Sequence, residues 1–146
     1  MHREVTSALR AGKSIVTGGA LGVDYWATET ALGIDPARLK VILPTSQATY
    51  AAHYRRRAAE GVISAQQAED LVRQLQDVAH AGGLVEHPER PQVIDVTTYY
   101  RRNQDVVDVA DELLVFQVNA SGGVQDTVNR ARAKGIPVVV FTYQAQ

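Results

Sequence analysis

The sequence predicts an α/β protein with a mainly parallel sheet that helices cover on both faces. Two observations predict this fold class. Short runs of almost wholly apolar residues, typical of strands buried on both faces, lie at residues 14–17, 39–43, 113–116 and 136–141. Segments with helical periodicity separate these runs, and parallel strands need such crossover connections.

The 146 residues are expected to form one domain, residues 1–146, with a hydrophobic core. Hydrophobic residues make up 45% and charged residues 21%, as in soluble globular proteins. The formal net charge is −1, so nucleic-acid binding would need a local basic patch. The absence of cysteine excludes disulfides and thiol catalysis. No apolar run approaches the ~20 residues of a membrane span, and no signal peptide is evident, so we expect a cytoplasmic protein with no membrane partner.

Helices are expected between the strands, because apolar residues there recur at spacings of three and four. In the first, over residues 2–11, Val5, Ala8 and Leu9 share one face, and Gly12 ends the helix. The other expected helices span residues 22–33, 47–60, 65–81, 98–110 and 122–134.

Capping residues mark two helix starts. Ser46 is expected to cap the helix over residues 47–60, and Ser64 with Gln67 forms a capping box before the next helix. Behind the box runs an amphipathic stripe of Ala68, Leu71, Val72, Leu75, Val78 and Ala79. Residues 84–96 remain open between short strands and extended loop.

A glycine turn follows the first strand, in the stretch Thr17-Gly18-Gly19-Ala20-Leu21-Gly22-Val23-Asp24. Glycines let the backbone approach a ligand, and the next helix offers free N–H groups and a positive dipole end to a phosphate. Asp24 is a candidate acceptor for a ribose hydroxyl or a base. The alternative is that the glycines only permit a tight turn and Asp24 only satisfies local N–H groups.

A second turn, Ser121-Gly122-Gly123, follows the third apolar strand and opens a helix. Ser121 can cap that helix, and the amides of Gly122 and Gly123 can hold a phosphate. A plain helix cap is the alternative. Ligands in parallel sheets bind at the carboxyl ends of the strands, so two such turns at one edge of one sheet predict an anion-binding crevice.

Basic and aromatic residues cluster at two places. In Tyr99–Asn103 an arginine can clamp a phosphate and a tyrosine can stack on a base, unless this is a solvated helix start. Arg55–Arg57 with Tyr50 and Tyr54 is a pattern that nucleic-acid binders use, although a solvated face has the same pattern. The four histidines show no ligand spacing, so we assign no metal.

Four features in this order resemble the superfamily that unites DNA-processing protein A with the LOG-type ("lonely guy", lysine decarboxylase-like) proteins. They are the Thr17–Asp24 turn, the Arg102-Asn103 pair, the Ala110-Asp111 dipeptide before a strand, and Ser121-Gly122-Gly123 before a helix. The resemblance runs from about residue 5 to 141 and is weakest over residues 60–95. It implies a Rossmann-like three-layer α/β/α fold that binds nucleotides or their derivatives between these loops.

The resemblance also implies a set of site residues. Gly18, Gly19, Gly22 and Asp24 would form one wall, and Arg102 would clamp the phosphate. The complete set of expected ligand-binding residues is Thr17, Gly18, Gly19, Ala20, Gly22, Asp24, Pro44, Thr45, Arg102, Asn103, Ser121, Gly122, Gly123 and Val124.

The sequence departs from the superfamily pattern in two ways. The hydrolases carry Pro-Gly-Gly-x-Gly-Thr-x-x-Glu, and here Asn129 stands where that glutamate does the acid–base work. Asp24 and Asp126 are the remaining catalytic candidates, with Glu29 as a third carboxylate. These proteins also begin with a strand and a Gly-Ser-Arg-like loop, whereas Met1 stands almost at the first helix, so we expect a sheet without the usual first strand.

The leading hypothesis is a sensor or carrier that binds a nucleotide-type small molecule and uses no cofactor. One alternative is a LOG-type hydrolase that cleaves the N-glycosidic bond of nucleoside 5′-monophosphates. Another is a protein similar to DNA-processing protein A that binds single-stranded DNA through Arg55–Arg57. We expect a homodimer, with the helix over residues 65–81 as its surface unless the apolar stripe of that helix is core.

Overall fold

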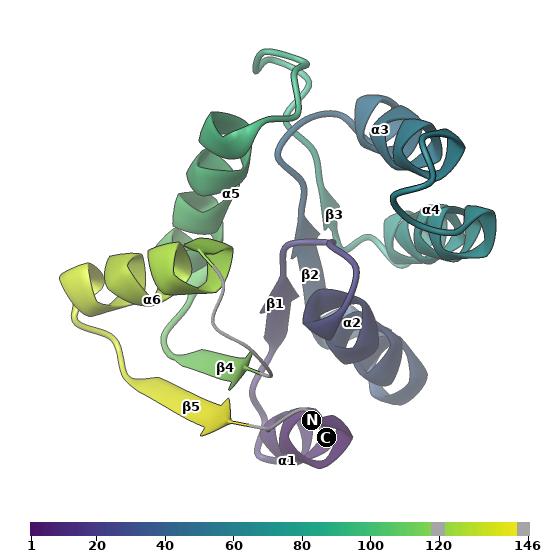
Figure 1. The fold of residues 1–146 in the computed structure, drawn as a ribbon. Coiled ribbons are helices and arrows are strands. Elements are labelled where there is room, and N and C mark those ends of the chain that lie inside the picture. Colours follow the sequence, from purple (N-terminus) through teal and green to yellow (C-terminus); the bar gives the residue numbers. More distant parts are fainter. Residues whose placement is uncertain (118–121, 143–146) are drawn as a thin grey trace. The chain divides into compact units, whose positions relative to one another are not determined.

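The protein has an α/β fold with parallel strands and surrounding helices (Figure 1). The computed structural model describes residues 1–117 and 122–142. The chain divides into two compact units, Met1–Ile94 and Asp95–Gln146, and each is described by itself. The expected single domain over residues 1–146 stays a prediction.

The first unit contains a three-stranded parallel sheet in the order β1-β2-β3. Its strands are β1 (Ile15–Thr17), β2 (Leu39–Ile42) and β3 (Leu84–Val85). Ile15 lies opposite Leu39, and Val41 lies opposite Leu84. Of the open segment 84–96, only Leu84–Val85 forms a strand. Because the strands are parallel and sequential, their carboxyl ends lie at the same edge of the sheet.

Four α-helices belong to this unit, and their bounds agree with the sequence expectations to within a residue or two. They are α1 (His2–Arg10), α2 (Val23–Ile34), α3 (Gln47–Ala59) and α4 (Ala65–His80), with a short 3₁₀ turn, η1 (Pro36–Arg38), before β2. Figure 1 shows α2, α3 and α4 on one side of the sheet, which follows from right-handed crossovers between sequential strands. None of the described helices is long and apolar enough to cross a membrane.

Helix α4 begins with the expected capping box. Ser64 Oγ accepts from the backbone N–H of Gln67, and Gln67 Oε1 accepts from the backbone N–H of Ser64. Its stripe is core, because every member except Ala79 is buried. Ala79 is exposed, so its expected inward position was wrong. Gln74 is buried instead, and its amide donates to the Tyr25 carbonyl and the Glu29 carboxylate on α2. The stripe therefore packs within this unit rather than offering a dimer surface.

The second unit pairs β4 (Leu113–Gln117) with β5 (Val138–Thr142) in a parallel sheet flanked by α5 (Val96–Val109) and α6 (Gly122–Lys134). Phe116 and Phe141 stack on neighbouring strands, with ring centroids 5.1 Å apart. The Lys134 ammonium donates to three carbonyls at the end of α5, where the helix dipole favours a cation.

The described strands form a three-stranded parallel sheet in the first unit and a two-stranded parallel sheet in the second. A single sheet that joins the two units stays a prediction. Among the described residues, β1 is the first strand along the chain, and it follows α1.

Candidate functional site

The glycine turn after β1 is built from two glycines with positive φ, Gly19 at +70° and Gly22 at +81°. Gly19 is buried, and a Cβ there would lie 2.8 Å from Leu43 Cδ2 and 3.0 Å from Val41 Cγ1. Gly22 has open space around it. Gly19 is therefore required by packing and backbone conformation together, whereas Gly22 is required by backbone conformation alone.

The Asp24 carboxylate is hydrogen-bonded to the backbone of this turn. Its Oδ2 atom accepts hydrogen bonds from the Gly18 amide at 3.2 Å and the Ala20 amide at 3.3 Å. Asp24 thus satisfies local N–H groups, as the alternative interpretation proposed. Both bonds go to Oδ2, and Oδ1 has no hydrogen-bond partner in the described chain. One carboxylate oxygen thus holds the turn through two backbone amides.

Helix α2 begins directly after the turn, with Gly22 as its N-cap residue and no side-chain cap. The first amides of a helix have no acceptor within the helix. No described residue accepts from the Val23, Asp24 or Tyr25 amide. These three amides and the helix dipole place positive partial charge at the carboxyl end of β1.

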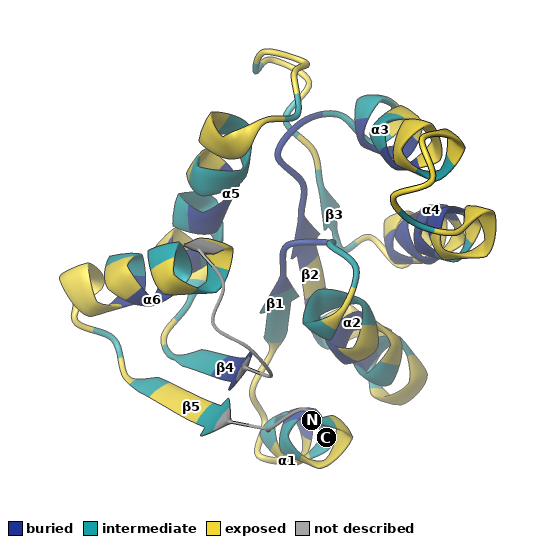
Figure 2. Ribbon diagram, viewed as in Figure 1, coloured by how far each residue is buried: buried dark blue, intermediate teal, exposed yellow. Residues whose placement is uncertain are grey.

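Three predicted ligand residues near this edge are buried, which limits what their side chains can contact. The Thr17 hydroxyl lies 2.9 Å from the Thr28 hydroxyl in the interior. Pro44 and Thr45 follow β2 in a stretch that Figure 2 shows as buried. Thr17, Pro44 and Thr45 are therefore part of the packed interior beside the carboxyl ends of β1 and β2.

Sequence reasoning missed a polar clamp over the start of α3. The expected cap is present, since Ser46 Oγ accepts from the Thr49 amide at 3.2 Å. In addition, Gln92 Oε1 accepts from the Ser46 amide at 3.2 Å, and Glu86 Oε1 accepts from the Gln47 amide at 2.7 Å. No local pattern signals these bonds, because the partners lie 39 and 46 positions apart.

The basic and aromatic cluster of α3 separates onto two faces. Tyr50 and Tyr54 are buried, with their hydroxyls 3.3 Å apart, so neither ring is available to stack on a base. Arg55 lies outside and forms an ion pair with Glu69 at 2.9 Å. Among the described residues, the aromatic half of the expected nucleic-acid surface is therefore core.

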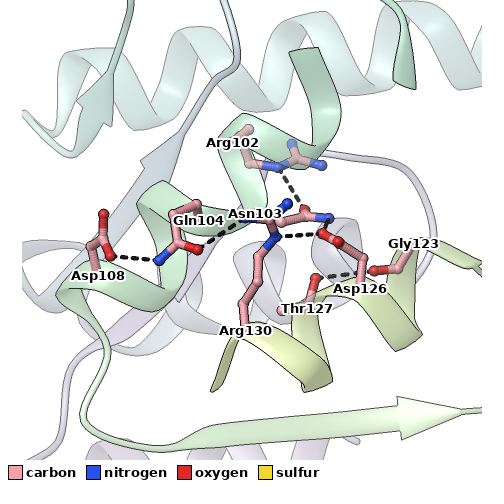
Figure 3. Close-up of polar contacts among 8 residues, drawn as sticks. All are labelled: Arg102, Asn103, Gln104, Asp108, Gly123, Asp126, Thr127 and Arg130. Atoms are coloured by element: carbon pink, nitrogen blue, oxygen red, sulfur yellow. Dashed lines mark hydrogen bonds and ion pairs between the residues drawn. The ribbon is translucent and has the colours of Figure 1, made fainter. Parts of the chain in front are cut away.

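In the second unit, Asn103 and Asp126 belong to a polar network between α5 and α6 (Figure 3). Asp126 Oδ2 accepts from Asn103 Nδ2 at 3.1 Å and from Arg130 Nε at 2.8 Å. Arg130 also donates to Gln104 Oε1 at 2.9 Å. Burial raises the pKa of Asp126, but the bonds from Arg130 and Asn103 outweigh it and hold that pKa below its ordinary value. The ionised Asp126 carboxylate on α6 therefore links this helix to α5 through Asn103.

Arg102, the expected phosphate clamp, is also buried. Its Nε donates to Asn103 Oδ1 at 3.3 Å, and its guanidinium carbon lies 5.4 Å from the centre of the Tyr99 ring. Asn129, at the position of the hydrolase glutamate, accepts from Gln125 at 2.8 Å.

The second glycine turn is described only in part. Ser121 lies outside the described residues, Gly122 begins α6, Gly123 is exposed and Val124 is half-buried. The two turns belong to different units, so the crevice between them stays a prediction.

The described residues hold no group of three or more histidine or acidic side chains placed to bind a metal ion. No protein-family model and no curated protein sequence matches this chain. The resemblance to the superfamily of DNA-processing protein A and LOG-type proteins therefore remains a prediction from the four motifs.

Proposed function

We propose that this protein binds a nucleotide-type small molecule through its phosphate at the Gly18–Asp24 turn, as a sensor or carrier. One observation carries the proposal. The α2 helix begins at the carboxyl end of a parallel strand with no side-chain cap, and its first amides have no acceptor on the described chain. This is the geometry in which helix N-termini bind phosphate.

The position of Asp24 favours a ligand that carries hydroxyl groups as well as a phosphate. Its charge disfavours an anion placed directly against the carboxylate. A nucleotide avoids that cost when its phosphate lies on the α2 amides and a ribose hydroxyl donates to Asp24 Oδ1. Inorganic phosphate cannot make the second contact without its charge approaching the carboxylate, so we expect it to bind more weakly.

The contacts of Asp126 favour binding over hydrolysis. Cleavage of an N-glycosidic bond needs a carboxylic group that exchanges a proton at the sugar. Asp126 is held by Arg130 and Asn103 with a lowered pKa, so it is a poor proton donor near neutral pH. Asn129 has no ionisable group. The hydrolase is therefore the weaker alternative.

The proposal is tested by titrating the protein with nucleoside 5′-monophosphates, the matching nucleosides and inorganic phosphate. Trp26 is the only tryptophan, is 61% exposed and begins the second turn of α2, so its fluorescence reports on this region. Calorimetry gives an independent Kd. We expect at least one monophosphate to bind about tenfold or more tightly than its nucleoside, since the phosphate adds charge-assisted hydrogen bonds.

Gly22→Ala is the matched variant, because alanine strains the positive φ without any clash. Gly12→Ala is its control, since Gly12 has a φ of +85°, also lies in open space and follows α1 away from the turn. We expect Gly22→Ala to weaken binding about tenfold and Gly12→Ala to leave it within about twofold. Equal losses in the two variants, or no binding of any monophosphate, would refute the proposal. Release of free base that Asp24→Asn abolishes would establish the hydrolase instead.

A further inference from the structure

A cavity of about 210 Å³ lies beside α3, inside the Met1–Ile94 unit and formed by residues separate from the glycine turn. One wall is a single face of α3, with Thr49, His53 and Arg56 at helical spacing. The other wall is the segment Gln92, Val93 and Ile94. Pockets for drug-sized ligands measure roughly 300–1,000 Å³, so this cavity suits a smaller molecule.

The second wall is held in place by the Gln92 side chain. Gln92 Oε1 accepts from Ser46 Oγ at 2.9 Å, and Gln92 Nε2 donates to the Arg90 carbonyl at 2.6 Å and the His87 carbonyl at 3.3 Å. These bonds tie the wall to the N-cap of α3. Val93, the next residue in this wall, is apolar, yet 58% of its surface is accessible.

Arg56 gives the cavity wall a positive charge. Arg55, one position before Arg56, is paired with Glu69, but no described residue forms an ion pair with Arg56. His53 is half-buried, and burial is the main cause that lowers its pKa. The nearby charges of Arg57 and Arg56 lower this pKa further, whereas the charge of Glu60 raises it. An anion bound beside Arg56 would supply the opposite charge that no described ion pair gives this guanidinium.

We propose that this cavity binds a small organic anion, a phosphate or carboxylate group carrying a short apolar chain. Arg56 would hold the anionic group through its guanidinium fork. The Thr49 hydroxyl lies on the same helix face and is able to donate to it. The apolar chain would cover Val93 and Ile94. This site is independent of the nucleotide site at the glycine turn.

The test is an NMR titration of the full chain with butyl phosphate, butyrate, inorganic phosphate and butanol. We expect saturable shifts at the amides of the cavity residues with butyl phosphate or butyrate, and weaker binding of inorganic phosphate and butanol. Which of the first two binds more tightly identifies the anionic group. Absence of saturable shifts up to about 20 mM of both would overturn the proposal.

Two exposed arginines provide matched variants that remove the same charge. Arg56→Gln is expected to weaken binding at least about tenfold, whereas Arg57→Gln, which does not line the cavity, should change it by less than about twofold. Val93→Ser should weaken butyl phosphate but not inorganic phosphate. Equal effects of the two arginine variants would show that only the general charge of α3 attracts the anion, and this would overturn the site. Gly22→Ala should leave this binding unchanged, which separates it from the nucleotide site.

Discussion

Gly19→Ala is expected to destabilise the Met1–Ile94 unit through a steric clash in its core. The new Cβ would lie 2.8 Å from Leu43 Cδ2 and 3.0 Å from Val41 Cγ1, and both of these side chains are completely buried. Overpacking of a well-packed core costs about 1–3 kcal/mol. The φ of +70° adds about 1 kcal/mol for alanine. We expect the free energy of unfolding to fall by about 2–4 kcal/mol.

The assay is urea unfolding followed by Trp26 fluorescence, which reports on the Met1–Ile94 unit. Gly12→Ala has a similar φ, +85°, but its Cβ would meet nothing within 4 Å, so it should cost only about 1 kcal/mol. The difference between the two variants isolates the clash with Leu43 and Val41. If Gly19→Ala proves no more destabilising than Gly12→Ala, the argument that packing selects glycine at this turn is wrong.

Three further predictions concern single polar contacts. Thr28→Val leaves the buried Thr17 hydroxyl without its partner and should cost about 1–2 kcal/mol in chemical unfolding, and the Thr17→Val/Thr28→Val double variant should cost less than the sum of the two single variants. Ser64→Ala removes the capping box and should cost about 1 kcal/mol, whereas Ser7→Ala on the exposed face of α1 should cost less than about 0.5. Because the folded pKa of Asp126 is lowered, its stabilisation is present above the ordinary pKa of 3.8 and lost as pH falls through the folded value. Wild type should therefore lose more stability than Asp126→Asn between pH 5 and pH 2, by about 1 kcal/mol after screening by solvent, and parallel curves would refute this.

Short-range features of the sequence were predicted well, because the forces that decide them act within one or two turns of chain. The Ser46 cap and the Ser64–Gln67 box are present, and helix bounds agree to within one or two residues. The glycine turn after β1 is also present, and Gly19 and Gly22 adopt positive φ there. Asp24 shows the limit of such reasoning, since its role as a local acceptor and its proposed role toward a ligand use different oxygens of the same group.

The features that could not be predicted depend on partners far apart in the sequence. Tyr50 and Tyr54 fit a sequence pattern that nucleic-acid binders use. In the structure α3 packs against α4, and both tyrosine side chains are buried in the core. The bond between Gln92 and Ser46 crosses 46 positions, and nothing in either local segment indicates it. These contacts depend on which helix faces meet, and periodicity alone does not state which partner an apolar face will find.

The α/β class, the order of the elements, the helix caps and the place of the glycine turn follow from the sequence alone, because apolar periodicity and capping chemistry are local properties. The pairing of Asp126 with Arg130 across one turn of α6 and with Asn103 on α5 became evident only from the folded chain. The tertiary structure also brought the α3 face of Arg56 against Val93 to form a charged cavity. Each of these outcomes depends on long-range packing, in which a side chain acquires its role only when the surface it faces is known.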